Sequence, residues 1–155
     1  MKPKFEADRL DWKIIELLQR DARMSNTEIG KIIGLSQPAV TSRIRALEQA
    51  GVIAGYGARI NPRALGHEIT AIIRLRTTHE KISQCLAAFE RTPEILEAHR
   101  VTGEDCFVVK ASFAHMPKLE ATIDALASLG SVTTSLVLAS YPSKPLTAPQ
   151  GTLRP

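Results

Sequence analysis

The sequence predicts an α+β protein with an N-terminal helix-turn-helix domain and a C-terminal βαββαβ domain of the ferredoxin-like type. Three observations support this prediction: two capped helical patterns between residues 25 and 53, a glycine-rich connector after them, and alternating strand and helix periodicities from residue 69 onward. A chain of 155 residues suits two small domains, and its apolar fraction of 44% is sufficient for two cores.

The first helix is expected to be capped by Asp11, with Leu10 and Ile15 forming a hydrophobic staple across its first turn. Trp12 falls on the opposite side of this helix from the predicted apolar stripe, so it is expected to be partly exposed or covered by another element. The residues of this stripe are Ile14, Leu17 and Leu18.

Ser25 and Glu28 have the spacing of a capping box at the start of the second helix, and Gly34 is expected to end this helix. Gly30 lies inside the helix, where glycine costs roughly 1 kcal/mol relative to alanine, so we expect a close helix–helix crossing there. The predicted apolar stripe consists of Ile29, Ile32 and Ile33.

The third helix is expected to be capped by Ser36 and to end at Gly51, with Val40, Ile44 and Leu47 turned inward. Its opposite face is polar and mostly uncharged or basic, and such side chains can hydrogen-bond to base edges and phosphates. An ordinary solvated helix face is the alternative, but the repeated cap-and-staple pattern favours a DNA-reading helix. The residues on this face are Pro38, Thr41, Ser42, Arg45 and Gln49, with Gln37 and Arg43 flanking them.

The remainder of the chain predicts four strands and two helices. Strands are expected at residues 69–75, 95–102, 107–114 and 132–139. One helix should bury Ile82, Cys85, Leu86 and Phe89, and the other should begin at Pro117 and bury Leu119, Ile123 and Leu126. Both helices are expected on one face of the sheet, which leaves the other face for a partner, most simply a second copy of the chain.

These patterns predict four segments: a DNA-binding domain at 1–52, an extended hinge at 53–66, a sheet domain at 67–141 and a mobile proline-rich tail at 142–155. The net charge is +4, of which residues 1–60 contribute +3 (ten basic, seven acidic) and the rest +1 (ten basic, nine acidic). This mild excess in the first half points weakly to a polyanion. We expect a cytoplasmic protein, because neither a membrane span nor a signal peptide is evident. Cys85, Cys106 and the four histidines lack metal-ligand spacing, so neither metal nor cofactor is expected.

Three stretches resemble the Lrp/AsnC family of transcription regulators. They are LDWKIIELLQRDARMSNTEI near the start, LSQPAVTSRIRALEQAGVIAGYGARINP from Leu35 to Pro62, and RVTGEDCFVVKA from Arg100. The resemblance spans about residues 8 to 141. It implies a winged helix-turn-helix domain, a sheet domain that dimerises, and assembly into tetramers or octamers. It also implies an amino-acid effector bound in clefts between dimers, and no enzymatic activity.

The resemblance also implies two sets of functional residues. The set for DNA is Ser36, Gln37, Pro38, Ala39, Thr41, Ser42, Arg43 and Arg45; within it, Arg43 and Arg45 are expected to contact phosphate or guanine, and Gln37 and Thr41 base edges. The set for the effector is Thr102, Gly103, Glu104, Asp105, Thr134, Ser135 and Leu136. Many relatives carry Gly-acidic-x-Asp in this loop, whereas this chain has Cys106 in the last position.

Two other functions are compatible with parts of the pattern, and a third, RNA binding, is not. The sirohaem decarboxylases share the two-domain arrangement, and His99 with Arg100 is the feature that could serve such an enzyme. An effector-independent architectural DNA-binding protein is a second alternative. RNA binding on the sheet is rejected, because the third strand carries Phe107 and Phe113 but the first carries no aromatic residue to stack bases.

Overall fold

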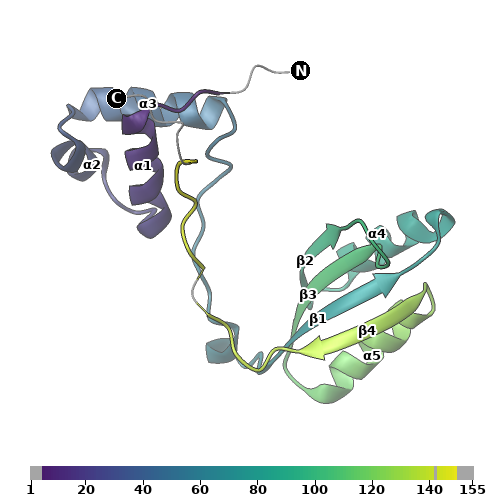
Figure 1. Cartoon of the computed structure of the whole chain (residues 1–155). Helices are drawn as coiled ribbons and strands as arrows, with labels where there is room; N and C mark the ends of the chain where they lie inside the picture. Colours follow the sequence, from purple (N-terminus) through teal and green to yellow (C-terminus); the bar gives the residue numbers. More distant parts are fainter. Residues whose placement is uncertain (1–4, 142, 150–155) are drawn as a thin grey trace. The chain divides into compact units, whose positions relative to one another are not determined.

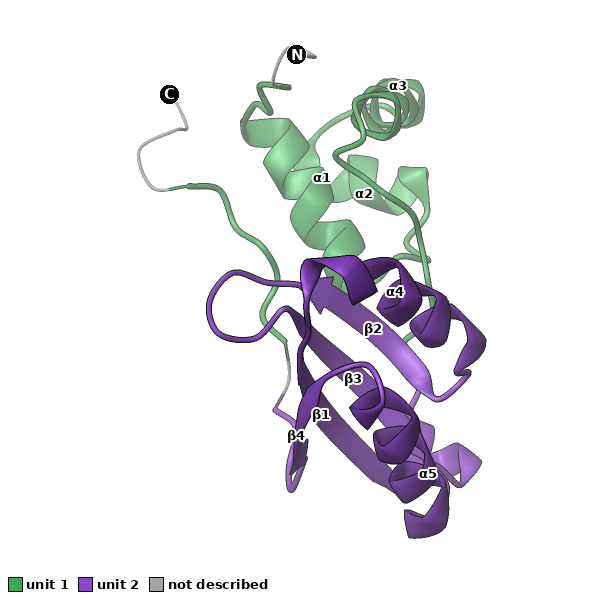
Figure 2. Cartoon of the chain, turned by 90° about the vertical axis from the view of Figure 1, so that its right-hand side faces the viewer, with its two compact units in different colours: residues 1–59, 142–155 green, residues 60–141 purple. Residues whose placement is uncertain are grey.

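The computed structural model describes residues 5–141 and 143–149. The chain forms two compact units, coloured separately in Figure 2. The first unit contains Met1–Arg59 and the C-terminal stretch from Pro142, and the second contains Ile60–Tyr141. The chain therefore passes from one unit to the other twice, after residue 59 and after residue 141.

Helix α1 (Arg9–Arg20) is capped by Asp8, so the prediction of Asp11 as its cap is wrong by three residues. The Asp8 carboxylate accepts hydrogen bonds from the backbone N–H groups of Leu10 and Asp11, both at 2.8 Å. The Asp11 carboxylate in turn accepts the N–H of Asp8, which completes a capping box. Two aspartates three residues apart both suit a helix start, and the structure uses the first as cap and the second as its partner.

Helices α2 (Asn26–Ile33) and α3 (Gln37–Gln49) form the predicted helix-turn-helix with α1. The caps Ser25 and Ser36 are confirmed, and Gly34 ends α2 with a φ of 75°. Ile32 was expected in the apolar stripe of α2, but it is 59% exposed, because a helix of eight residues presents only a narrow stripe to its two neighbours. The fully buried core of the unit consists of Ile14, Ile29, Val40 and Leu47.

The sequence predicts a close contact at Gly30, between two helices. The structure has a close contact there, but the group nearest to Gly30 belongs to the turn between α2 and α3. A Cβ at this position would overlap the carbonyl oxygen of Leu35, and its contact with Val40 of α3 would be an ordinary 3.6 Å. The turn therefore packs directly against the backbone of α2. This contact determines how tightly α3 follows α2.

Residues 52–61 form the connector and contain neither helix nor strand. Tyr56 folds back on α3, where its hydroxyl donates a hydrogen bond of 2.8 Å to Glu48. Partial burial, together with this hydrogen bond and the charge of Glu48, raises the pKa of Tyr56 to about 12, so the hydroxyl remains a donor at neutral pH. The beginning of the connector is thus attached to the helix-turn-helix.

The predicted mobile tail lies against the first unit over its described residues. Both polar atoms of the Gln19 side chain hydrogen-bond to the backbone of Leu146, and Arg59 donates to Ser143. These hydrogen bonds were not expected from the sequence, and the mobility of residues 143–149 stays a prediction. The remainder of the predicted tail, 142 and 150–155, lies outside the described residues.

The second unit is a four-stranded antiparallel sheet with the order β2-β3-β1-β4 (Figure 1). Both of its α-helices cover the same face, as Figure 2 shows. The strands are β1 (Ile69–Arg76), β2 (Ile95–Arg100), β3 (Phe107–Phe113) and β4 (Ser131–Leu136), and the helices are α4 (Ile82–Arg91) and α5 (Met116–Ala127). Short 3-10 helices, η1 (Pro62–Leu65) and η2 (His79–Lys81), precede β1 and α4. This is the predicted ferredoxin-like topology.

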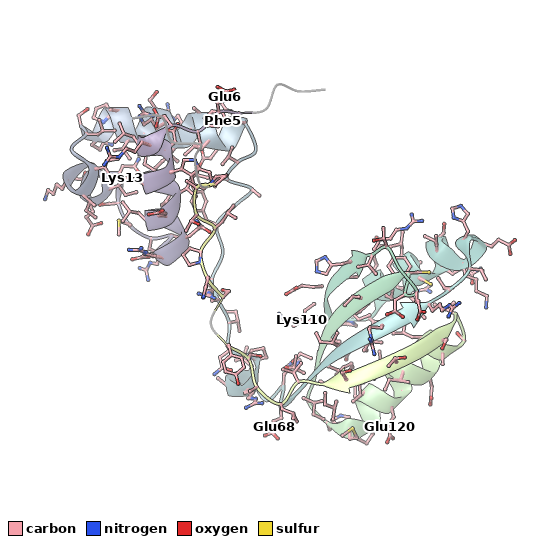
Figure 3. All side chains as sticks on the ribbon, in the orientation of Figure 1. Phe5, Glu6, Lys13, Glu68, Lys110 and Glu120 are labelled. Carbon is pink, nitrogen blue, oxygen red and sulfur yellow. The ribbon has the colours of Figure 1, made fainter. Side chains whose placement is uncertain are left out.

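The core of this unit lies between the sheet and its two helices. Ala71, Ile73 and Leu75 of β1 are fully buried there, as predicted from their alternation. Leu86 was expected in the core but is 49% exposed, and Ala88 packs there instead. The open face carries alternate residues such as Ile72 and Lys110, the latter labelled in Figure 3.

Replacing Gly30 by alanine should destabilise the first unit by roughly 2 kcal/mol or more, because the new Cβ would overlap the turn carbonyl. Urea unfolding followed by circular dichroism measures this loss. Gly55→Ala is the matched control, since a Cβ there meets nothing within 4 Å. Equal stabilities of the two variants would contradict the close approach.

Candidate nucleic-acid interface

The outward face of α3 forms a shallow hollow of about 540 Å³. Five of the eight predicted DNA-contacting residues lie around it, and the two positions that the predicted set lacks are Ala46 and Gln49. Its lining consists of Gln37, Pro38, Thr41, Ser42, Arg45, Ala46 and Gln49. Small and uncharged side chains surround a single arginine, so the surface can approach the edges of bases closely.

Arg45 is the cation of this face. Its side chain is exposed, and within the described part of the chain it makes neither an ion pair nor a hydrogen bond. Its guanidinium is therefore available to an external acceptor. Arginine presents paired N–H donors that fit guanine or a phosphate group.

Arg43 makes an ion pair inside the fold, and its role as a DNA contact stays a prediction. Its guanidinium is 2.7 Å from the carboxylate of Asp8 and 2.8 Å from that of Asp11. The Asp11 side chain is only 8% exposed, so this ion pair is shielded on one side. Arg43 ties the middle of α3 to the start of α1 and thereby orients the helix that carries Arg45.

The charges of this cluster support one another. Partial burial acts to raise the pKa of Asp8, but the backbone N–H of Asp11 and the Arg43 guanidinium outweigh it, and the net effect lowers that pKa. Hydrogen bonds to Asp11 and then to Asp8 raise the pKa of Arg43. Asp8 and Arg43 are therefore both charged at neutral pH, and their ion pair persists over the physiological range.

Thr41 has a positioning role within the face. Its hydroxyl donates to the backbone carbonyl of Gln37 and accepts a hydrogen bond of 2.9 Å from the Asn26 side chain. A longer contact of 3.4 Å comes from the Gln37 amide. Because its hydroxyl already has these partners, Thr41 can offer its methyl group for an apolar contact with a base. The hydrogen bond from Asn26 also joins α2 to α3.

Two further members of the predicted set lie off the hollow. Ser36 uses its hydroxyl to cap α3 by accepting the N–H of Ala39, and Ala39 itself is half-buried. The helix start can still offer backbone N–H groups to a phosphate. Sequence reasoning missed Ala46 and Asn26, although the helical periodicity places Ala46 one turn after Ser42.

The predicted effector loop lies between β2 and β3 at the end of the sheet. Gly103 has a φ of 115°, which only glycine adopts readily, and Thr102 and Glu104 are exposed. The Asp105 carboxylate lies 4.0 Å from the Arg74 guanidinium of β1. Cys106 occupies the position of the relatives' second aspartate, and its thiol donates to the carbonyl of Thr77 at 3.2 Å. The loop thus offers one free carboxylate, that of Glu104.

The three effector residues predicted on β4 do not share a face. Thr134 and Leu136 pair with Ile73 and Ala71 on the helix-covered side, whereas Ser135 pairs with Ile72 on the open side. Within one chain β1 separates β4 from β3, so the loop that precedes β3 and the residues of β4 lie on strands that are not neighbours. The buried hydroxyl of Thr134 lacks a hydrogen-bond partner within the described part of the chain.

The features that carried the alternative functions have ordinary structural surroundings. The His99 side chain is 65% exposed and lies 3.7 Å from Glu97. Phe107 packs edge-to-face on Phe89 beneath the sheet, with ring centres 5.2 Å apart, and Phe113 is fully buried, so neither can stack on a base. Within the described residues, neither a metal-binding cluster nor a helix long and apolar enough to cross a membrane is present.

Comparison with known proteins defines the class of protein. Residues 8–48 match the AsnC-type helix-turn-helix domain, and residues 70–146 match the Lrp/AsnC ligand binding domain. The HTH-type transcriptional regulator FL11 of Pyrococcus furiosus is 36% identical over 125 residues, which cover 81% of this chain and 83% of that protein. The chain belongs to the Lrp/AsnC family and is a transcriptional regulator with a DNA-binding domain and a ligand-binding domain.

Solved structures agree with this assignment. LrpC of Bacillus subtilis has a TM-score of 0.85 at 26% identity, covering 90% of this chain and all of the other. A transcriptional regulator of Neisseria meningitidis in complex with L-methionine has a TM-score of 0.83 at 26% identity, covering 94% of this chain and 97% of the other. The predicted family and fold class are thereby confirmed.

Replacing Arg43 by alanine should destabilise the first unit by roughly 1–3 kcal/mol, because it leaves the Asp11 carboxylate shielded from water without its cation. Urea unfolding at pH 7 measures this loss. Lys13→Ala is the control, because Lys13 is an exposed cation of α1 (Figure 3) and should change stability by about 0.5 kcal/mol at most.

The pH dependence provides a second criterion for this ion pair. Because the pKa of Asp8 is lowered in the folded protein, its stabilising contribution is fully present above its ordinary value of 3.8. This contribution is lost as the pH falls through the lower, folded-state value. The stability difference between wild type and Arg43→Ala should therefore shrink in acid, and a difference that grew would exclude the ion pair as its cause.

Proposed function

We propose that the outward face of α3 reads the major groove of double-stranded DNA, with Arg45 as its charged contact. The single observation that carries this proposal is the exposed Arg45 side chain, which has no partner among the described residues and is set among uncharged side chains. The same hollow is lined by Gln37, Pro38, Ser42 and Gln49. Arg43 acts behind this face by holding α3 on α1.

Dimerisation through the open face of the sheet belongs to the same proposal. This face carries the apolar Ile72 and Val108, both half-buried, between the charged residues Arg74 and Lys110. A second copy would cover the apolar centre and could assemble further into tetramers or octamers. Two recognition helices related by two-fold symmetry would then bind half-sites about one helical turn, ~34 Å, apart.

An amino acid is the proposed effector, by similarity to the Neisseria regulator that binds L-methionine. The loop at residues 102–105 would take part through backbone N–H groups near Gly103, which suit a carboxylate, and through Glu104, which suits an ammonium group. A pocket completed by another subunit is consistent with the separation of this loop from β4 in one chain.

Replacing Arg45 by alanine should weaken binding to a selected DNA duplex by about 1–3 kcal/mol if the side chain reads guanine, with relaxed preference at one base pair. If Arg45 contacts phosphate, the loss of affinity should be the same for every DNA sequence. The slope of log affinity against log salt concentration should then decrease by about one. Fluorescence anisotropy at several salt concentrations measures both.

The control for this experiment is Arg91→Ala, which removes one exposed cation from α4 of the sheet unit and preserves the net charge of the test variant. Its affinity should equal that of the wild type. Unchanged affinity of Arg45→Ala on every duplex would refute the assigned contact.

Titrating the full-length protein with each of the twenty amino acids should identify a ligand by calorimetry. Glu104→Gln should then weaken its binding roughly tenfold, because the ammonium group loses a charged partner. Glu120→Gln is the control, since Glu120 lies on α5, on the helix side of the sheet (Figure 3). Heat from none of the twenty, or equal affinities for both variants, would contradict the proposed effector loop.

A further inference from the structure

The first unit contains a groove that its DNA-reading face does not use. This groove has a volume of about 790 Å³ and lies between α1 and the connector. Trp12, Ile15 and Leu18 of α1 line it, together with residues 52–59 of the connector. Leu146, from the C-terminal stretch, contributes to the same lining. An apolar groove of this size is large enough to hold side chains of an extended peptide.

Gln19 recognises the backbone of the C-terminal stretch at two points. Its Nε2 donates to the carbonyl oxygen of Leu146 at 2.9 Å, and its Oε1 accepts the N–H of the same residue at 2.8 Å. The side-chain amide thus pairs with one residue in the way a neighbouring strand would. Two bonds to one backbone unit specify the position of the peptide along the groove.

Arg59 contacts the same stretch at a second place, because its guanidinium donates to the hydroxyl of Ser143. Arg59 is the last connector residue that belongs to the first unit, before the chain enters the sheet unit. Pro145 and Pro149 restrict the backbone between and after these contacts. Proline fixes φ near an extended value, so such a segment loses less conformational freedom when it docks.

We propose that the groove between α1 and the connector is a peptide-binding site whose ligand is residues 143–149 of the same chain. The paired hydrogen bonds of the Gln19 amide with the Leu146 backbone and the Arg59–Ser143 contact are the two elements of recognition. Docking joins the two units by a second stretch of chain besides the connector, and thereby limits how far the helix-turn-helix can move from the sheet.

The test compares the full chain with a chain that ends at Tyr141. Trp12 is the only tryptophan of the protein, so its fluorescence reports on the groove. Without residues 143–149, its emission should shift to longer wavelength and acrylamide should quench it more strongly. Trypsin cleavage after Arg59 should accelerate roughly tenfold, because local opening no longer has to precede it. Cleavage after Arg63, in η1, should keep its rate and serves as the internal control.

Gln19→Glu provides the same test in a chain of full length. The carboxylate keeps the size of the side chain but cannot donate to the Leu146 carbonyl, and Gln19 is exposed, so the fold of α1 is unaffected. The variant should show the same faster cleavage after Arg59. Glu16→Gln, on the same helix, is the matched control and should behave like the wild type. If both the shortened chain and Gln19→Glu retain wild-type quenching and cleavage rates, the proposal is overturned.

A mixture of the two altered chains distinguishes docking within one chain from exchange between copies. The shortened chain has an intact groove but no ligand, and Gln19→Glu has the ligand but an impaired groove. Docking within one chain predicts that mixing protects neither. Protection of Arg59 in the shortened chain by the other variant would contradict docking within a single chain.

Discussion

The ion pair between Arg43 and the two aspartates at the start of α1 is the interaction on which the arrangement of the helix-turn-helix depends. One face of α3 is polar and exposed, and the opposite face packs on two short helices through Val40, Ile44 and Leu47. The ion pair adds a directional contact to these apolar ones and helps to determine how α3 is rotated about its own axis. Arg43 reaches from the border of these two faces to Asp8 and Asp11, which already form the capping box of α1. One cluster therefore starts α1 and orients α3.

The position of Gly30 complements this ion pair. The turn between α2 and α3 can approach α2 only because residue 30 lacks a Cβ, and the Asn26–Thr41 hydrogen bond closes the same side. Consequently, Arg45 and the hollow beside it are held by backbone packing on one side and by charge on the other. The sheet unit differs, since one face of its sheet is covered by α4 and α5 and the other is left open.

Local periodicity and capping rules were sufficient to predict the α-helices and strands of the described residues, because each has its own hydrophobic pattern and stop signal. The contacts that were not predicted join residues that are distant in sequence. The pairing of Arg43 with Asp8 spans 35 residues, and the contact of Gln19 with Leu146 spans 127. Asp8 and Asp11 were equally good caps by type, and the backbone N–H groups that the Asp8 carboxylate accepts are what identify Asp8 as the cap. The exposure of Ile32 and Leu86 reflects how few neighbours surround short helices.

For the candidate site, the outward residues of α3 followed from helical geometry, whereas the division of labour between Arg43 and Arg45 required the structure. The effector residues of β4 show the same limit, because alternate residues of a strand face opposite sides and a pocket between subunits has no signal in one chain. The capacity of residues 143–149 to dock was hidden by their low periodicity. Their backbone, rather than their side-chain pattern, is what Gln19 recognises.

The most direct test of the account is site-specific photo-crosslinking to a duplex selected from random sequence. A photoreactive residue at position 42, on the outward face of α3, should crosslink to bases in two patches about one helical turn apart. The same residue at position 120, on α5, should give no crosslinks. Crosslinks from position 120 with none from position 42 would contradict the central claim that α3 reads DNA.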